Sequence, residues 1–393
     1  MNPPEPPPDT SPIVEPPKRT VPPAVRAVLI VFLLYLFLVG VKLLESGVKG
    51  LGDETAGGLF NGITNPLAAL FVGILATVLV QSSSVTTSTI VGLVAVPAAI
   101  GQPPILPLET AIPMIMGANI GTSVTNTIVS LAHARRSDEF RLAFSAATMH
   151  DLFNLITVAI LLPLELTTHF LQRTATWMAE LLPGGADATF DSPIKGAVGW
   201  GAKQIVRVIE PLFSSETATG IALIVVGIAI IFIALIYITK NMKILIAARI
   251  ERSVNAALAK SGLVGIGVGI VVTVAVQSSS ITTSILVPIV ASGMLLVRNA
   301  YPITLGANIG TTVTALIAAL ATGSIDGMTI AIVHLLFNVV GILIIYPWGK
   351  IRYLPVVLAE KLAEFAVQRK WIAVAYTITV FIAIPIVGIL VLS

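Results

Sequence analysis

Two serine clusters hold the residue types best suited to binding a small ion. The tetrapeptide Gln-Ser-Ser-Ser occurs at residues 81–84 and again at 277–280, each time inside a long apolar stretch. Serine hydroxyls donate hydrogen bonds without a fixed charge, and their lone pairs can ligate Na⁺. Broken helices also expose N–H groups and a positive dipole end, which suit an oxyanion. The candidate anion ligands are Ser82, Ser83, Ser84, Ser278, Ser279 and Ser280.

These clusters also have a structural interpretation. Serine and threonine in membrane helices often bond back to a backbone carbonyl or hold two helices together. One isolated cluster would favour that interpretation, whereas two matching copies, each followed by Thr-Thr-Ser after one residue, favour a binding site. Asn119 and Asn308 are further candidates because a buried amide needs partners. The glycines that flank them, in Gly-x-x-x-Gly spacing, fit either helix packing or a ligand role.

Asp151 is the acidic residue placed deep inside an apolar span, ten residues after Arg141. An acid inside a membrane is costly and marks a functional site by default, so we expect a cation or proton site, with a structural hydrogen-bonding role as the alternative. Asn154 lies three residues later and can share its helix face. For His150 and His334, a structural hydrogen bond is the favoured role, ahead of proton relay. Arginine is absent from the interior of the spans, since Arg26 and Arg141 stand at span ends, so no guanidinium clamp on an anion is evident.

Composition places the chain in the membrane class. Of its 393 residues 55% are hydrophobic and only 11% are charged, against roughly 25% in soluble domains. The net charge of +3 is too small to indicate a nucleic-acid partner, and the absence of cysteine excludes disulfides and thiolate sites. We find no nucleotide loop, metal cluster or nucleophile–base pair, so we expect a transporter without a cofactor and not an enzyme.

The clusters must be positioned by membrane helices. Seven apolar segments are long enough to span roughly 30 Å of hydrocarbon, and two more, 65–100 and 261–296, carry the serine clusters in their middle. A polar cluster facing lipid would be costly, so we expect both to form re-entrant hairpins with the cluster at the tip. The full spans are expected at 25–46, 106–132, 141–165, 218–240, 300–322, 327–349 and 371–392.

Basic residues predict the orientation. With a cytoplasmic N-terminus, 17 of the 23 lysines and arginines fall on cytoplasmic positions and 6 on external ones, which agrees with the positive-inside rule. We therefore expect five segments in a plasma-membrane protein. They are a disordered proline-rich cytoplasmic tail (1–24), a first transmembrane repeat (25–165), an external loop (166–217), a second repeat (218–349), and a cytoplasmic link with a final helix (350–393).

The two halves repeat one another. Residues 81–91 match 277–287 at 8 of 11 positions, and 117–132 match 306–321 at 11 of 16. The predicted topology turns the second repeat upside down relative to the first. Inverted repeats are typical of alternating-access transporters, whose site lies at the repeat interface near the midplane. The predicted fold is thus all-α and polytopic, with two inverted repeats that each hold a re-entrant hairpin and a broken helix.

The paired Gln-Ser-Ser-Ser and Gly-Ala-Asn-Ile-Gly-Thr motifs, with the runs 143–165 and 334–347, resemble the type II sodium/phosphate cotransporters. The resemblance covers roughly residues 25–393 and implies sodium-coupled phosphate import. Asp151 matches an aspartate of the electrogenic members, which implies an extra Na⁺ site. Two departures from the family are expected: 166–217 is shorter than the loop of vertebrate members and has no cysteine, and we expect no counterpart of the cytosolic domain of some bacterial relatives. The residues expected to bind phosphate are the six serines with Asn119 and Asn308. The residues expected to bind sodium are Gln81, Gln277, Thr122, Thr311, Asn126, Asn154 and Asp151.

Two alternatives stay open. One is a symporter, coupled to Na⁺ or H⁺, for another small oxyanion such as arsenate, sulfate or a carboxylate. The other is an anion channel or sensor, against which the inverted repeat weighs.

Overall fold

The computed structural model describes residues 22–51, 63, 65–96, 105–182, 193–258, 262–349 and 351–392. These residues form helices and turns, with no strand among them. Six helical segments are long and apolar enough to cross a membrane, so the prediction of an all-α polytopic membrane protein is confirmed. They are α1 (Pro23–Gly50), α7 (Ser137–Thr168), α10 (Glu216–Leu258), α13 (Val297–Thr322), α14 (Ile325–Ile345) and the terminal segment Trp371–Leu392. Nearly all of the proline-rich tail lies outside the described residues.

Both serine clusters lie at the turn of a helical hairpin, as the sequence predicted. The first hairpin is α3 (Pro66–Val80) followed by α4 (Ser83–Val94), and the second is α11 (Gly262–Val276) followed by α12 (Ser279–Ala291). These helices have 12 to 15 residues. At 1.5 Å per residue each is about 18–22 Å long, too short to cross roughly 30 Å of hydrocarbon.

The expected span 106–132 is not one helix. It divides into α5 (Leu108–Gly121) and α6 (Val124–Leu131), with the break at Thr122 and Ser123. Both side chains bond back to carbonyls of the preceding turn, yet Thr311 and Thr312 do the same in α13, which runs unbroken. The expectation of a broken helix is therefore met in the first repeat and wrong for α13 in the second.

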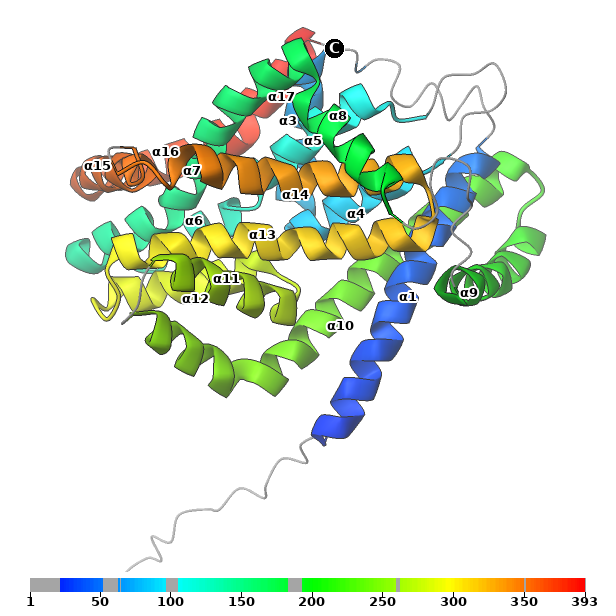
Figure 1. The fold of residues 1–393 in the computed structure, drawn as a ribbon, viewed down its shortest axis with the longest axis horizontal. Helices are drawn as coiled ribbons and strands as arrows, with labels where there is room; N and C mark the ends of the chain where they lie inside the picture. Colours follow the sequence, from blue (N-terminus) through cyan, green and yellow to red (C-terminus); the bar gives the residue numbers. More distant parts are fainter. Residues whose placement is uncertain are drawn as a thin grey trace, which may run out of the picture.

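The two repeats are interleaved. Within each repeat the first hairpin helix packs on the helix that follows the hairpin, α3 on α5 and α11 on α13. The second hairpin helix packs across the repeats, α4 against α13 and α14, and α12 against α6 and α7 (Figure 1). Exchanging the repeats turns one set of contacts into the other. Each hairpin therefore belongs to its own repeat by sequence and is held by both.

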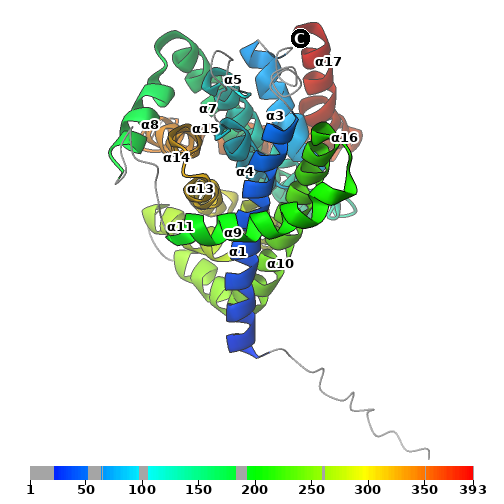
Figure 2. The ribbon, with the colours of Figure 1, turned by 90° about the vertical axis from the view of Figure 1, so that its right-hand side faces the viewer.

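The first helices of the two repeats, α1 and α10, lie side by side (Figures 1 and 2). Glycines bring them together: a Cβ on Gly47 would lie 2.7 Å from the carbonyl oxygen of Gly220, and one on Gly40 would lie 2.9 Å from that of Gly227. Small residues at such crossings let helix backbones approach closely in a membrane.

The expected external loop 166–217 is largely helical where it is described. α7 continues to Thr168, and α8 (Phe170–Glu180), α9 (Pro193–Ile209) and the 3₁₀ turn η1 (Glu210–Leu212) follow. α8 packs on α14, and α9 crosses α1 (Figure 2). The buried Glu165 carboxylate accepts the backbone N–H groups of Leu171 (2.6 Å) and Gln172 (3.1 Å), which caps the start of α8.

The C-terminal part is also more structured than expected. The link begins with α15 (Leu354–Gln368), which packs along α7. The final segment consists of α16 (Trp371–Ile378), a π-helix η2 (Thr379–Ala383) and α17 (Ile384–Leu392), and α17 packs on α3.

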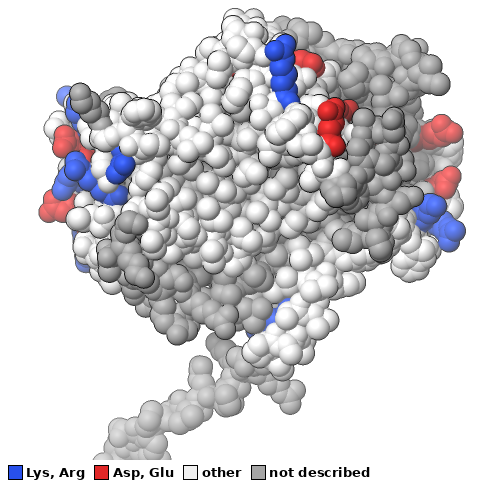
Figure 3. All heavy atoms as spheres, viewed as in Figure 1, with Lys and Arg blue, Asp and Glu red and all other residues white. Residues whose placement is uncertain are grey.

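Charged side chains are unevenly spread over the surface. In Figure 3 they gather mainly at opposite ends of the molecule, and a broad field in the middle of this face carries none. An uncharged field of this kind is the surface expected where a protein faces lipid.

Candidate functional site

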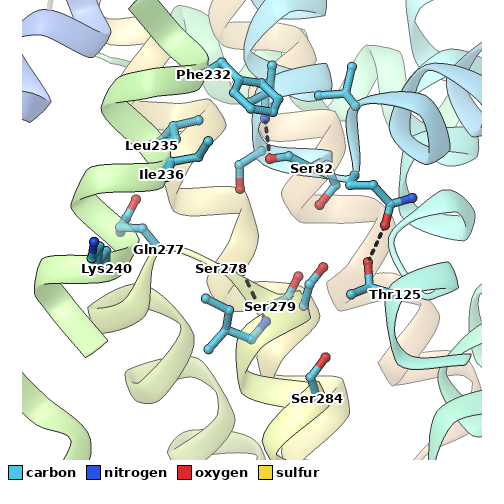
Figure 4. Close-up of a pocket in the computed structure, with 17 residues that line it drawn as sticks. Ser82, Thr125, Phe232, Leu235, Ile236, Lys240, Gln277, Ser278, Ser279 and Ser284 are labelled. Atoms are coloured by element: carbon cyan, nitrogen blue, oxygen red, sulfur yellow. Dashed lines mark hydrogen bonds between the residues drawn. The ribbon is translucent and has the colours of Figure 1, made fainter. Parts of the chain in front are cut away.

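Both serine clusters line one cavity of about 540 Å³ (Figure 4). We call residues 81–84 the first tip and 277–280 the second tip. α10 contributes three apolar residues and one lysine to the lining. The lining comprises residues 80–85 and 277–281 with Thr125, Ser284, Phe232, Leu235, Ile236 and Lys240. The structure therefore brings the two distant motifs together at a single cavity.

A glutamine ends the first helix of each hairpin in the same way. Gln81 and Gln277 adopt left-handed backbone conformations, with φ of 55° and 57°. Each side-chain amide donates to a carbonyl three residues earlier, at 2.6 Å, and so satisfies a free helix-terminal acceptor. Each amide oxygen accepts a hydroxyl from the same repeat, Thr125 at 3.2 Å and Thr314 at 3.0 Å. Both repeats thus fix their tip by the same Gln–Thr contact.

A serine begins the second helix of each hairpin. Ser82 and Ser278 are N-caps whose hydroxyls accept the backbone N–H groups of Val85 and Ile281, both at 3.3 Å. α4 and α12 therefore both begin at the cavity, with their positive dipole ends there. The remaining tip serines, Ser83, Ser84, Ser279 and Ser280, lie in the first turns of these helices and line the cavity.

The glycines of the paired Gly-Ala-Asn-Ile-Gly motifs serve packing. A Cβ on Gly117 would overlap the carbonyl oxygen of Leu70, and one on Gly306 would overlap that of Ile266. Neither glycine lines the cavity. Of the two roles left open by the sequence, the structure supports close packing of the hairpin on the following helix.

Four buried asparagines form a network between the repeats. Asn308 donates to the side chain of Asn154 at 3.0 Å, and Asn338 donates to that of Asn119 at 3.3 Å. His150 pairs with Asn308 at 2.5 Å, which fits the structural role expected of it. Exchanging the repeats converts the first Asn pair into the second. Asn119 and Asn308 do not line the cavity, so the structure does not place them with the tip serines.

Asn126 joins α6 to the second hairpin. Its side-chain oxygen accepts hydroxyls from Thr283 at 3.0 Å and from Ser284 at 2.9 Å, both on α12. The repeat-equivalent residue is Ala315, which has no amide, and Ser88, the equivalent of Ser284, is buried without a hydrogen-bond partner among the described residues. This link between a tip helix and the helix after the break therefore exists in one repeat alone.

Asp151 is fully buried beside the break between α5 and α6 and does not line the cavity. One carboxylate oxygen, Oδ2, accepts hydroxyls from Thr127 at 3.4 Å and from Tyr376 at 3.2 Å. The other, Oδ1, has no partner within the described part of the chain. A buried oxygen without a donor is where a cation can bind.

Two of the predicted sodium ligands make local bonds. The hydroxyls of Thr122 and Thr311 donate to carbonyls four residues earlier, at 2.8 and 3.1 Å, which is the helix back-bonding that the sequence left as an alternative. Neither residue lines the cavity. Of the seven predicted sodium ligands, the two glutamines line the cavity, whereas the other five are buried and do not line it.

Sequence reasoning missed several residues. Thr125 and Thr314 occupy equivalent places in the repeated motif, a signal that could have been used. Lys240 was used only to predict the membrane orientation, yet it lines the cavity and is the charged residue among the described lining residues. Tyr376 gave no signal, because it stands alone in an apolar segment outside both repeats. Glu45 is also nearly buried, paired with Lys42 at 2.7 Å, so Asp151 is not the sole acid inside a long helix.

Comparison with known proteins supplies the family. A family model described as Na⁺/Pi-cotransporter matches residues 36–179 and 230–359. The human sodium-dependent phosphate transport protein 2B (Homo sapiens) is 32% identical over 92% of this chain and 64% of its own length. The rat protein 2A (Rattus norvegicus) is 33% identical over 90% of this chain and 65% of its own length. The chain thus spans just under two thirds of these relatives.

No solved structure matches the chain. The two segments matched by the family model each contain one hairpin and its tip, and together they include every residue that lines the cavity. The chain is a multi-pass membrane protein that belongs to the Na⁺/Pi-cotransporter family.

Proposed function

We propose that this chain is a sodium-coupled symporter that imports inorganic phosphate by alternating access. The observation that carries the proposal is the single cavity shared by the two serine tips. Membership of the Na⁺/Pi-cotransporter family and the similarity to proteins named sodium-dependent phosphate transport proteins support the choice of ions. A membrane transporter of this kind is not an enzyme and needs no cofactor beyond its coupling ion.

Phosphate binds at the tips in this proposal. α4 and α12 start at the cavity, and helix N-termini with serine hydroxyls are anion sites. The phosphate ligands are Ser82, Ser83, Ser84, Ser278, Ser279 and Ser280. Because these donors are uncharged, the anion can be released as well as bound. Asn119 and Asn308 act from the buried network that holds the two repeats together.

Sodium uses oxygen ligands of two kinds. Gln81 and Gln277 line the cavity, while the other five, Thr122, Thr311, Asn126, Asn154 and Asp151, are buried and do not line it. The unpartnered Oδ1 of Asp151 supports a cation site there. The repeat-equivalent residue is Leu335, so this charge occurs once. Transport that uses this carboxylate as an additional Na⁺ site moves net charge and is electrogenic.

The topology completes the proposal. Two inverted repeats, with the N-terminus cytoplasmic in the plasma membrane, bring the tips together from opposite sides. The exchanged packing of α4 and α12 across the repeats supports a two-fold relation between them. Rocking of one hairpin against the other repeat then opens the shared cavity to either side in turn.

Uptake of radiolabelled phosphate into liposomes under Na⁺, K⁺ or H⁺ gradients tests this function. We expect uptake with the inward Na⁺ gradient alone; equal uptake in all three would reject sodium coupling. Competition by arsenate, sulfate or a carboxylate tests the oxyanion alternative, and flux without saturation would indicate a channel.

Asp151→Gly tests the charge-moving role. We expect the variant to keep sodium-dependent uptake with much less current per phosphate. Retention of both uptake and current would reject the role given to Asp151.

A further inference from the structure

The terminal helical segment reaches the buried acid of the first repeat. Tyr376, on α16, donates its hydroxyl to Oδ2 of Asp151 at 3.2 Å, across 225 residues of sequence. The family model ends its second match at residue 359, so α16 lies beyond the matched residues. The contact therefore joins the buried acid to an element outside both repeats.

Aromatic contacts hold the Tyr376 ring in place. It meets Phe144 of α7 edge to face, with centroids 6.2 Å apart, and Phe381 at 6.3 Å. Phe381 is fully buried and belongs to the π-helix η2, which begins three residues after Tyr376. π-helical turns inside longer helices occur frequently at functional sites. Edge-to-face packing on two sides restricts the direction in which the hydroxyl can point.

The two oxygens of Asp151 have different surroundings. Oδ2 receives Tyr376 and Thr127, whereas Oδ1 has no partner among the residues that the structure describes. A carboxylate held by donors on one oxygen presents the other in a fixed direction. Orienting partners of this kind tune metal ligands, and their loss typically reduces metal affinity about 10- to 100-fold.

We propose that Tyr376 is a positioning residue that orients the Asp151 carboxylate for a cation and thereby ties the last helical segment to the sodium site. The inference rests on the proposed sodium-coupled function, whose Asp151 site it extends. It assigns a role to Tyr376 that depends on the hydroxyl alone, since the ring would pack equally well as phenylalanine.

Tyr376→Phe tests the proposal, with Tyr301→Phe as the matched control. Tyr301 is also a buried tyrosine, but its hydroxyl has no partner among the described residues. We expect Tyr376→Phe to raise the Na⁺ concentration for half-maximal uptake about tenfold or more. The phosphate concentration for half-maximal uptake, measured at saturating Na⁺, should change less than twofold, and Tyr301→Phe should change neither value.

A second measurement does not depend on transport. Na⁺ that binds the folded protein raises its unfolding temperature in detergent relative to choline. Tyr376→Phe should need about tenfold more Na⁺ for the same rise. In an Asp151→Gly background, Tyr376→Phe should add nothing further, because the group it orients is gone.

Three results would overturn the inference. They are an unchanged sodium dependence in Tyr376→Phe, a change in the half-maximal Na⁺ concentration no larger than that in Tyr301→Phe, and an effect of Tyr376→Phe that simply adds to that of Asp151→Gly. Wild-type protein without sodium-dependent phosphate uptake would instead reject the proposed function. The sodium-dependent stabilisation then still decides whether Tyr376 orients a cation site.

Discussion

Asn126 gives the sharpest prediction, because it is the link present in one repeat and missing in the other. Asn126→Ala removes an amide oxygen that accepts two hydroxyls at 3.0 and 2.9 Å. Thr283 keeps its bond to the carbonyl of Ser279 at 2.8 Å, whereas Ser284 loses the partner that the structure gives it. The variant therefore recreates the arrangement seen at Ala315 in the second repeat.

The magnitude follows from these bonds. A neutral hydrogen bond contributes roughly 0.5–1.5 kcal/mol net, and one of the two hydroxyls keeps a partner, so we expect a loss of about 1–2 kcal/mol. If the phosphate-binding position of α12 depends on this link, the same free energy appears in binding. The phosphate concentration for half-maximal uptake should then rise roughly 5- to 30-fold, since about 1.4 kcal/mol is a factor of ten.

The control is Ser130→Ala. Ser130 is also buried on α6, but its hydroxyl bonds to the carbonyl of Thr127 within the same helix at 2.7 Å. Both variants are compared for half-maximal phosphate and for unfolding temperature in detergent. If Asn126→Ala behaves like Ser130→Ala, or like the wild type, the link does not position α12 and the reasoning fails.

Three further changes have defined outcomes. Gly117→Ala should destabilise the fold by about 1–3 kcal/mol, measured by thermal unfolding, because its Cβ overlaps the Leu70 carbonyl, whereas Gly199→Ala, in open space, should be neutral. Lys240→Gln should raise the phosphate concentration for half-maximal uptake about fivefold, because one cation at the cavity attracts the anion, whereas Lys240→Arg should keep the wild-type value. An unchanged value in Lys240→Gln would show that Lys240 is not part of the site. Glu165→Ala should cost about 1–2 kcal/mol by uncapping α8, seen as faster amide exchange there, and Glu165→Gln should cost less.

Sequence reasoning was most successful where polar residues interrupt apolar ones. The two hairpins followed from serine clusters that could not face lipid, and the repeat indicated that both tips serve one site. Their meeting at one cavity is now seen. Which serines bind phosphate and which oxygens bind sodium stays a prediction, as does the inverted orientation of the repeats.

The parts that sequence reasoning missed depend on packing between distant segments. The spacing between matching motifs does not show which helices pack against α4 or α12, so the interleaving of the repeats could not be predicted. Likewise, Thr122 and Thr311 both follow the same five residues, Gly-Ala-Asn-Ile-Gly, but the helix breaks only at the first. The helices in 166–217 could have been found: Val198, Ala202 and Ile209 recur at helical spacing and are buried in α9.

The most direct test of the central claim joins the two tips to one substrate. Ser83→Ala and Ser279→Ala, one from each tip, are compared singly and together in sodium-driven phosphate uptake, with each variant shown to be folded. If the tips form one shared site, either change alone should raise the phosphate concentration for half-maximal uptake. The effect of the double variant should then differ from the sum of the two single effects in free energy. Two saturable components, each altered by one of the changes, would show that the tips are separate sites and would contradict the account.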